Sequence, residues 1–281
     1  MLFKNSTPLV SVNWLYNNLT NKKLVILDAT IPKVTGDKLI KTKEKEQIKG
    51  AIFFDIKNVF SNKTQPFPNT VLSAEEFEKK AQNLGIQKNS FIVVYDDLGI
   101  YSSPRVWWLF QLMGFNNVVV LDGGFPEWKS KEYPTEKPQK REIKQGYFKT
   151  NYQTLKIKFL DDVLLSINND KYLIVDARSK GRFYATDPEP RADVKSGHIP
   201  NSINLPHSEI ISHGKLKSKV ELKEIFNQIN PNNKELIFSC GSGITASVLA
   251  LGAEIAEIKN YAVYDGSWTE WGSTENLPIE I

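Results

Sequence analysis

Cys240 is the only cysteine in the 281-residue chain and its most capable nucleophile. It follows the apolar run "LIFS" (236–239) and precedes "GSGITA" (241–246). The apolar run favours a buried strand, and the small and apolar residues after the loop favour a helix over about 246–258. Open α/β folds place ligand sites at the carboxyl end of such strands. We therefore expect a reactive thiol; the alternative is a small cysteine that only fills space in the core.

The loop after Cys240 has the composition of an anion cradle. Gly241 and Gly243 can adopt backbone angles that other residues avoid, so the loop over 241–246 can turn its N–H groups inward. Successive inward amides bind anions, and the positive end of the following helix adds to the attraction. A sulfur atom at the centre would be held as an anion. Cys240 is thus expected to act as a nucleophile near neutral pH.

A similar cradle serves cysteine phosphatases, which need an arginine six residues after the cysteine to clamp the phosphate. Here that position is Ala246. Without the arginine, phosphate-ester hydrolysis is disfavoured. A loop of this size fits one extra anionic sulfur better, so we expect it to stabilise a persulfide on Cys240.

The chain contains two copies of one pattern, with offsets of 143 to 148 residues between matching segments. A repeat of this length indicates a duplicated domain rather than a solenoid. Two of the matching segments begin with Ser-x-x-Glu, the signature of a capping box at a helix start. The matching pairs are "LVILDAT" (24–30) with "YLIVDAR" (172–178), "SAEEFEKKAQNLG" (73–85) with "SKVELKEIFNQIN" (218–230), "FIVVYD" (91–96) with "LIFSCG" (236–241), and "VVVLDGGFPEW" (118–128) with "YAVYDGSWTEW" (261–271).

Within each copy, short β-branched runs alternate with helical patterns. This alternation predicts an α/β fold with two tandem domains, each a mainly parallel sheet flanked by helices on both faces. We place an N-terminal domain at 1–132 and a C-terminal domain at 154–281. The lysine-rich stretch at 133–153 has few apolar residues and is expected to be an exposed linker. Aligning "VVYDDLGIYSS" (93–103) on "IFSCGSGITAS" (237–247) sets Asp96 opposite Cys240, so only the second copy has the thiol.

Composition excludes several classes of protein. The net charge of +4 is not gathered in a block, which argues against nucleic acid as a partner. No apolar run is long enough to span a membrane, and the first residues lack the features of a secretory signal. One cysteine cannot form an internal disulfide, so we expect a cytoplasmic protein. One cysteine and three scattered histidines do not make a metal site, and no cofactor is expected.

The sequence resembles the tandem-domain rhodanese superfamily, and within it the 3-mercaptopyruvate sulfurtransferase type. The resemblance covers nearly the whole chain and implies a catalytically silent N-terminal domain and a catalytic C-terminal domain. Its carriers are "SPRVWWLFQLMG" (103–114), "LDGGFPEW" (121–128), "DARSKGRFYATDPEPRADVKSGHIPNSINLP" (176–206), "CGSGITA" (240–246) and "YDGSWTEWG" (264–272).

The resemblance also implies roles for individual residues. "CGSG" is the form found in mercaptopyruvate enzymes, whereas thiosulfate enzymes usually carry charged residues after the cysteine. Two arginines of that class hold the carboxylate and ketone oxygens of the substrate, and the matching positions are Arg182 and Arg191. Alternatively, both are solvated surface arginines. Ser242 is expected to donate its hydroxyl toward the substrate or the leaving enolate. Substrate binding is further assigned to the loop residues Gly241, Gly243, Ile244, Thr245 and Ala246; Thr245 alternatively only caps the helix.

One position departs from the family pattern. Some members have a histidine in a His-Ile-Pro-Gly-Ala segment that is proposed to relay protons with an acid and the loop serine. The matching segment here is "QIKGA", so Gln47 stands in place of that histidine and the relay cannot be carried over. His198 is expected to be structural. Arg178 is a weaker candidate for substrate binding, because its place just after the strand end at Asp176 suits a structural ion pair.

The implied reaction is a two-step sulfur transfer. Cys240 takes sulfur from 3-mercaptopyruvate, pyruvate leaves, and the persulfide passes its outer sulfur to cyanide, a small thiol or thioredoxin. Two alternatives stay open: a thiosulfate sulfurtransferase with an atypical loop, and a non-enzymatic rhodanese-like module that carries sulfur or binds a partner.

Overall fold

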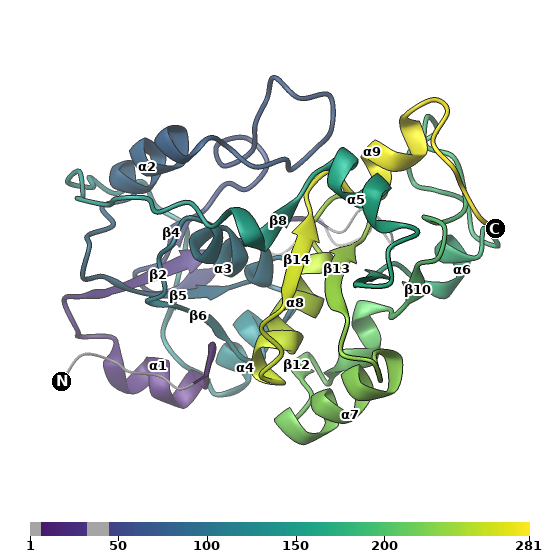
Figure 1. Ribbon diagram of the computed structural model, residues 1–281. Coiled ribbons are helices and arrows are strands. Elements are labelled where there is room, and N and C mark those ends of the chain that lie inside the picture. Colours follow the sequence, from purple (N-terminus) through teal and green to yellow (C-terminus); the bar gives the residue numbers. More distant parts are fainter. Residues whose placement is uncertain (1–6, 33–44) are drawn as a thin grey trace. The chain divides into compact units, whose positions relative to one another are not determined.

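The computed structural model describes residues 7–32 and 45–281, which form two compact units (Figure 1). Each unit includes a short stretch from the other half of the sequence. Unit 1 contains the described residues up to Phe60, Ser73–Tyr152 and His213–Lys215, and unit 2 contains Ser61–Leu72, Gln153–Ser212 and Leu216–Ile281.

Unit 1 is built on a parallel sheet with the order β1-β6-β5-β2-β4. Its central strand is the apolar run "FIVVY", all of it buried, which explains why β5 lies between two other strands. The five strands are β1 (Leu9–Val10), β2 (Leu24–Asp28), β4 (Ile52–Phe53), β5 (Phe91–Tyr95) and β6 (Val118–Leu121). A separate antiparallel pair joins β3 (Gln47–Ile48) to β7 (Thr135–Glu136).

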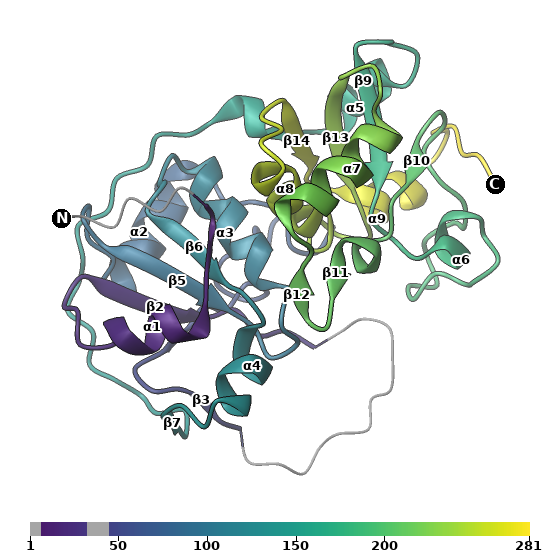
Figure 2. The same cartoon turned by 90° about the horizontal axis from the view of Figure 1, so that it is seen from below.

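Helices cover both faces of this sheet (Figure 2). Residues Phe91, Val93 and Tyr95 of β5 share one cluster with α1 (Val12–Asn18) and α4 (Gly124–Ser130). The opposite face carries an aromatic cluster in which Phe77 of α2 (Ala74–Asn83) meets Phe110 of α3 (Ser103–Leu112) edge-to-face. The expected capping box at Ser73 is present and begins α2.

Unit 2 repeats the arrangement. Its parallel sheet has the order β10-β9-β13-β14-β8, which is the order of unit 1 with each strand replaced by its counterpart. Ser239 at the end of β13 is in register with Asp176 at the end of β9, so the loops that follow these strands leave the same edge of the sheet. The strands are β8 (Ile157–Lys158), β9 (Tyr172–Asp176), β10 (Ile203–Asn204), β13 (Glu235–Ser239) and β14 (Tyr261–Tyr264).

The helices of unit 2 also lie on both faces. On one face α5 (Leu160–Ser166) and α9 (Ser267–Ser273) share a cluster with β9, β13 and β14. On the other face α8 (Ala246–Ile255) packs on β13 and β14, and α7 (Lys219–Ile229) packs on α8. The smaller elements are η1 (Thr154–Lys156), α6 (Lys180–Phe183), η2 (His207–Ile210), β11 (Ile211–Ser212) and β12 (Lys215–Leu216).

The two-copy α/β architecture expected from the sequence is confirmed. Two details differ. Helix α8 ends at Ile255 rather than near 258, because Glu257 takes a left-handed backbone with φ 66°. In the expected linker, Phe148 is fully buried against Phe110 and Phe115, so this part of the stretch packs onto unit 1 instead of lying exposed.

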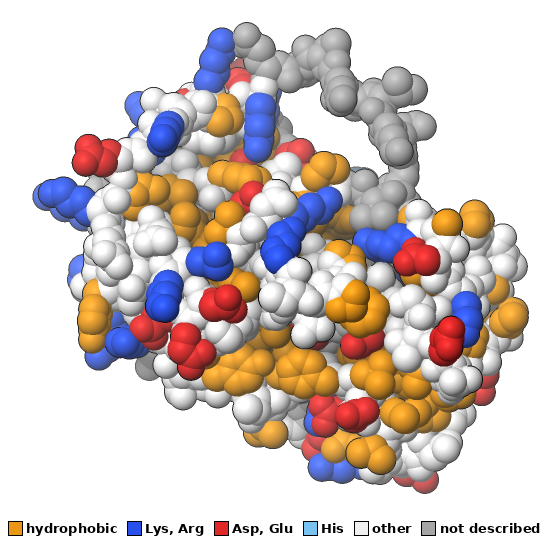
Figure 3. Space-filling model, turned by 90° about the horizontal axis from the view of Figure 1, so that it is seen from above, with side chains coloured by type: hydrophobic (Ala, Val, Ile, Leu, Met, Phe, Trp, Pro, Cys, Tyr) orange, Lys and Arg blue, Asp and Glu red, His pale blue; other side chains and the backbone are white. Residues whose placement is uncertain are grey.

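Charges of both signs are interspersed over the face shown in Figure 3. Hydrophobic side chains are exposed between them on this face. Within the described ranges, no helix has both the length and the apolar character that a membrane crossing requires.

Candidate functional site

Cys240 stands directly after β13 at the carboxyl edge of the sheet in unit 2. Its side chain is buried, with only 1% of the residue exposed, and it forms no disulfide. Helix α8 begins at Ala246, so residues 240–245 form the whole connection between strand and helix. Gly243 has φ 78°, a conformation that a side chain would make unfavourable, and this is the turn expected from the sequence.

The loop leaves a run of backbone N–H groups without acceptors. Of the six amides that follow Cys240, only that of Gly243 donates a hydrogen bond to another described residue. The five without an acceptor in the described part of the chain belong to Gly241, Ser242, Ile244, Thr245 and Ala246. Since backbone amides are rarely left unpaired in a folded protein, this set is suited to receive an anion.

The N-terminal end of α9 holds the loop in place. Ser267 Oγ accepts hydrogen bonds from the Cys240 amide at 3.3 Å and the Gly243 amide at 3.1 Å, and it donates to the Tyr264 carbonyl at 2.9 Å. The amide of Trp268 donates to the carbonyl of Cys240 at 2.9 Å. Ser267 was not among the residues predicted from the sequence. The alignment of "DGSW" (265–268) on "DGGF" (122–125) could have pointed to it, because it sets a serine in the second copy opposite a glycine in the first.

Arg182 lies against the Cys240 loop. A Cβ atom added to Gly241 would come within 3.2 Å of Arg182 Nη2, so a glycine at this position lets the guanidinium approach closely. The same guanidinium pairs with Glu189 through two hydrogen bonds, 2.6 Å from Nη2 and 3.1 Å from Nε. Arg182 therefore lies against the loop, and Glu189 is a counter-ion for its charge.

Arg191 reaches the loop indirectly. Its Nη1 donates to Thr269 Oγ1 at 3.1 Å, and that hydroxyl donates to the carbonyl of Gly241. Both arginines selected from the sequence are thus connected to the residues around Cys240. Neither is a fully solvated surface arginine.

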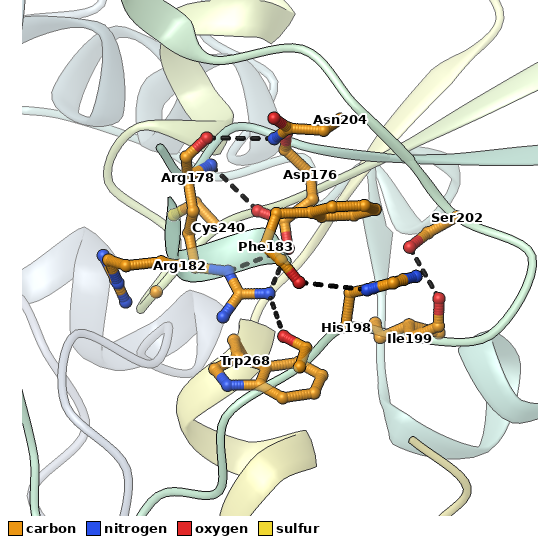
Figure 4. Close-up of polar contacts among 12 residues, drawn as sticks. Asp176, Arg178, Arg182, Phe183, His198, Ile199, Ser202, Asn204, Cys240 and Trp268 are labelled. Carbon is orange, nitrogen blue, oxygen red and sulfur yellow. Dashed lines mark hydrogen bonds and ion pairs between the residues drawn. The ribbon is translucent and has the colours of Figure 1, made fainter. Parts of the chain in front are cut away.

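Arg178 forms the structural ion pair that was expected. Its buried guanidinium pairs with Asp176 at 2.7 Å and Glu189 at 2.8 Å, and it lies 4.4 Å from the centre of the Trp268 ring (Figure 4). Burial opposes the charge, but the carboxylates of Asp176 and Glu189 prevail and raise the pKa of Arg178. Glu189, which the sequence analysis missed, is shared by Arg178 and Arg182.

The remaining loop side chains have different surroundings. Ile244 is buried, and Thr245 occupies the N-cap position of α8 without making a side-chain capping bond. The proposed capping role of Thr245 is therefore wrong. Ser242 is buried, and its oxygen accepts a hydrogen bond from the side chain of Asn69 at 2.9 Å.

The expected structural histidine is confirmed. His198 stacks on Phe183 at 3.8 Å between ring centroids, and its Nδ1 lies 3.0 Å from the Phe183 carbonyl (Figure 4). No cluster of three or more metal-binding side chains is found among residues 7–32 and 45–281.

Gln47, which stands where some family members have a histidine, is held inside unit 1. Its amide donates to the Ala51 carbonyl at 2.9 Å and to Glu136 at 3.0 Å. Burial of Glu136 opposes ionisation, but hydrogen bonds from the Gly50 amide, Gln47 and Arg141 lower its pKa to about 2. Gln47 therefore has a structural partner and faces a permanent carboxylate.

Comparison with known proteins places this geometry in a family. A family model for the rhodanese-like domain matches residues 11–131 and again residues 160–274. The 3-mercaptopyruvate sulfurtransferase of Mus musculus is 37% identical over 94% of this chain and 91% of its own length. The thiosulfate sulfurtransferase of Rattus norvegicus is 36% identical over the same shares.

A solved structure agrees with these relatives. The crystal structure of SseA from Escherichia coli, described as a 3-mercaptopyruvate sulfotransferase with the rhodanese fold, superposes with a TM-score of 0.82 at 31% identity. The match covers 94% of this chain and 99% of that one. The chain therefore belongs to the rhodanese family, with two rhodanese-like domains in tandem, and it is a sulfurtransferase.

Proposed function

We propose that this sulfurtransferase takes sulfur from 3-mercaptopyruvate, carries it as a persulfide on Cys240 and delivers it to a thiophilic acceptor. The observation that carries the proposal is the set of five amides after Cys240 that find no acceptor in the described part of the chain, with the Arg182 guanidinium placed against the same loop. Amides suit an anionic sulfur, and a guanidinium suits the carboxylate of a keto acid. Cyanide, a small thiol or a reduced thioredoxin can each accept the outer sulfur.

The first half-reaction needs no external proton. The Cys240 thiolate attacks the donor sulfur, an S–S bond forms, and the C–S bond breaks with its electron pair going to carbon. The enolate of pyruvate takes up the proton that the donor thiol gives away. What is left is pyruvate and an anionic persulfide on Cys240, which the loop amides stabilise.

The second half-reaction returns the enzyme to its starting state. The acceptor attacks the outer sulfur, the S–S bond breaks, and its electron pair returns to Cys240 as the thiolate. Ionised Cys240 is then ready for another donor. No redox cofactor takes part, because both steps transfer sulfur between nucleophiles.

In this proposal the arginines bind the keto-acid end of the donor. Arg182, which lies against the loop, meets the carboxylate, and Arg191 meets the ketone oxygen as charge develops there. Glu189 already balances part of the charge on Arg182, so this end of the site favours a substrate group with a single negative charge.

The test is a multiple-turnover assay with mercaptopyruvate and cyanide, followed by mass spectrometry of the enzyme after treatment with donor alone. We expect thiocyanate and pyruvate to form, and Cys240 to gain about 32 Da, one sulfur atom. Cys240→Ser should do neither. Turnover without an added sulfur on Cys240 would contradict the persulfide route.

A thiosulfate sulfurtransferase is the second candidate, supported by the relative from Rattus norvegicus. Thiosulfate is a dianion, and the six residues after Cys240 contain no cation to meet it. We therefore expect a higher kcat/KM for mercaptopyruvate than for thiosulfate; the reverse ratio would favour the second candidate. A cytoplasmic location is part of the same proposal and is checked by fractionating cells.

A further inference from the structure

Unit 2 contains a stretch from the first half of the sequence, Ser61–Leu72, and this stretch reaches the catalytic loop. Asn69 Nδ2 lies 2.9 Å from Ser242 Oγ and 3.4 Å from the Ser242 carbonyl oxygen. Two residues further on, the Val71 amide donates to Asp265 Oδ2 at 2.8 Å. Asn69 is 7% exposed, so its contact with Ser242 is shielded from water.

The backbone at Asn69 is consistent with a position chosen for its side chain. Its φ is 64°, in the left-handed region where asparagine is enriched among residues other than glycine. A backbone hydrogen bond also stabilises this stretch: the backbone N–H of Asn62 donates to the Thr70 carbonyl at 2.9 Å. The left-handed turn presents the Asn69 amide to the loop.

The orientation of the Asn69 side-chain amide follows from the two oxygen atoms of Ser242 that it faces. The Ser242 carbonyl oxygen can only accept a hydrogen bond, so the group facing it must be the NH₂ and not the oxygen. The same NH₂ faces Ser242 Oγ, which therefore acts as the acceptor in that contact.

This assignment determines what the serine can do. Because Ser242 Oγ accepts from Asn69, its own hydrogen is directed elsewhere, and no described residue accepts it. An asparagine side chain does not exchange protons near neutral pH. Ser242 is therefore prepared to donate a hydrogen bond and is not linked through Asn69 to a proton relay.

We propose that Asn69 is a positioning residue for sulfur transfer: it holds Ser242 so that the serine hydroxyl donates to the enolate oxygen that forms as the three-carbon fragment leaves. The proposal rests on the proposed function. It assigns the donor half-reaction, rather than the acceptor half-reaction, as the step that depends on Asn69.

The test is a double-mutant cycle with Asn69→Gly and Ser242→Ala. Glycine removes the side chain and keeps a backbone compatible with a φ of 64°. We expect Ser242→Ala to lower the single-turnover rate of persulfide formation about 100-fold, the usual effect of losing one oxyanion donor. Asn69→Gly should lower it about 10-fold. The double variant should match Ser242→Ala alone, because in this proposal Asn69 affects the reaction through the Ser242 hydroxyl, which that variant lacks.

Two further measurements separate positioning from a general structural effect. Discharge of the preformed persulfide to cyanide should be unchanged in Asn69→Gly. Asn69→Asp keeps the shape of the side chain but can only accept, so it should turn the Ser242 hydrogen toward itself and slow persulfide formation at least as much as glycine does. Asn62→Ala is the matched control in the same stretch and should leave both half-reactions unchanged.

The proposal is overturned if Asn69→Gly has no effect in the wild-type background, or if it slows the reaction equally in both backgrounds. Either result leaves the proposed function standing. Failure of the proposed function has a different signature, since the wild-type protein itself would then form no persulfide from mercaptopyruvate.

Discussion

The loops that follow β5 and β13 are counterparts, and they treat negative charge in opposite ways. In unit 1 the position of Cys240 is held by Asp96, whose Oδ2 accepts from the amides of Tyr101, Ser102 and Ser103 at 2.8 to 3.0 Å. The Ser103 hydroxyl also donates to Oδ2, at 2.6 Å.

The counterparts of Tyr101 and Ser102 in unit 2 are Thr245 and Ala246, whose amides have no acceptor within the described residues. A carboxylate oxygen stands two bonds from its Cβ, as the outer sulfur of a persulfide on Cys240 would. The loops after β5 and β13 therefore form the same kind of amide cradle. One copy is closed by an anion of its own, and the other is left open for an anion that the substrate supplies.

Moving the internal anion into the open cradle should produce the largest effect. Cys240→Asp removes the nucleophile, so turnover should fall to the level without enzyme. Its carboxylate should accept the loop amides, so the variant should be more stable to urea than Cys240→Ser by about 2 kcal/mol. A Cys240→Asp protein less stable than Cys240→Ser would show that the two cradles are not equivalent.

Opening the closed cradle should be costly. Asp96→Asn turns an NH₂ toward amides that need an acceptor, and we expect unfolding in urea to become easier by about 3 kcal/mol. Asp97→Asn is the matched control, because partial burial and the neighbouring Asp96 raise the Asp97 pKa to about 6.

A raised pKa means that ionised Asp97 opposes folding at neutral pH. Asp97→Asn should therefore be neutral or slightly stabilising at pH 7, and the difference should shrink as the pH falls through about 6 and vanish below about pH 3, where the wild-type carboxyl is protonated in both states. Equal destabilisation by both substitutions would argue against a special role for Asp96.

The arginines test the substrate side of the open cradle. Arg182→Ala and Arg191→Ala should each raise KM for mercaptopyruvate by about 30-fold, and KM for thiosulfate much less, since thiosulfate has no carboxylate. Lys180→Ala, next to Arg182 on the same helix and exposed, is the control and should change neither. Equal effects on the two donors would defeat the carboxylate assignment.

The smallest effect is expected at the residue that braces the loop. Ser267 has φ 51°, and its counterpart Gly124 has φ 53°. Ser267→Gly should relieve backbone strain and lose the hydroxyl contacts, so stability should change by less than about 1 kcal/mol while kcat falls about 10-fold. The reverse change, Gly124→Ser, should destabilise strongly, because a Cβ there would lie 2.5 Å from the Asp96 carbonyl. Unchanged kcat in Ser267→Gly would show that the brace is not needed.

Much of the fold and of the Cys240 loop was predictable, because both depend on local sequence patterns. The duplicated strands follow from the spacing of apolar residues, and the capping boxes at Ser73 and Ser218 follow from a short motif. The glycines after Cys240 predict the loop there. The contacts that complete the site are long-range. Asn69 meets Ser242 across 173 residues of sequence, and no local pattern marks it. Phe148 sits in a polar stretch whose composition suggested exposure, and only its aromatic neighbours explain its burial.

The position of Glu189 beside Arg182 has a consequence for product release in the proposed catalytic cycle. Glu189 balances part of the charge on Arg182, so in the proposed function an incoming keto acid competes with Glu189 for the guanidinium. That competition lowers the affinity of the site for pyruvate as much as for mercaptopyruvate. A site with such a competitor releases pyruvate readily, and the persulfide on Cys240 is then open to the acceptor.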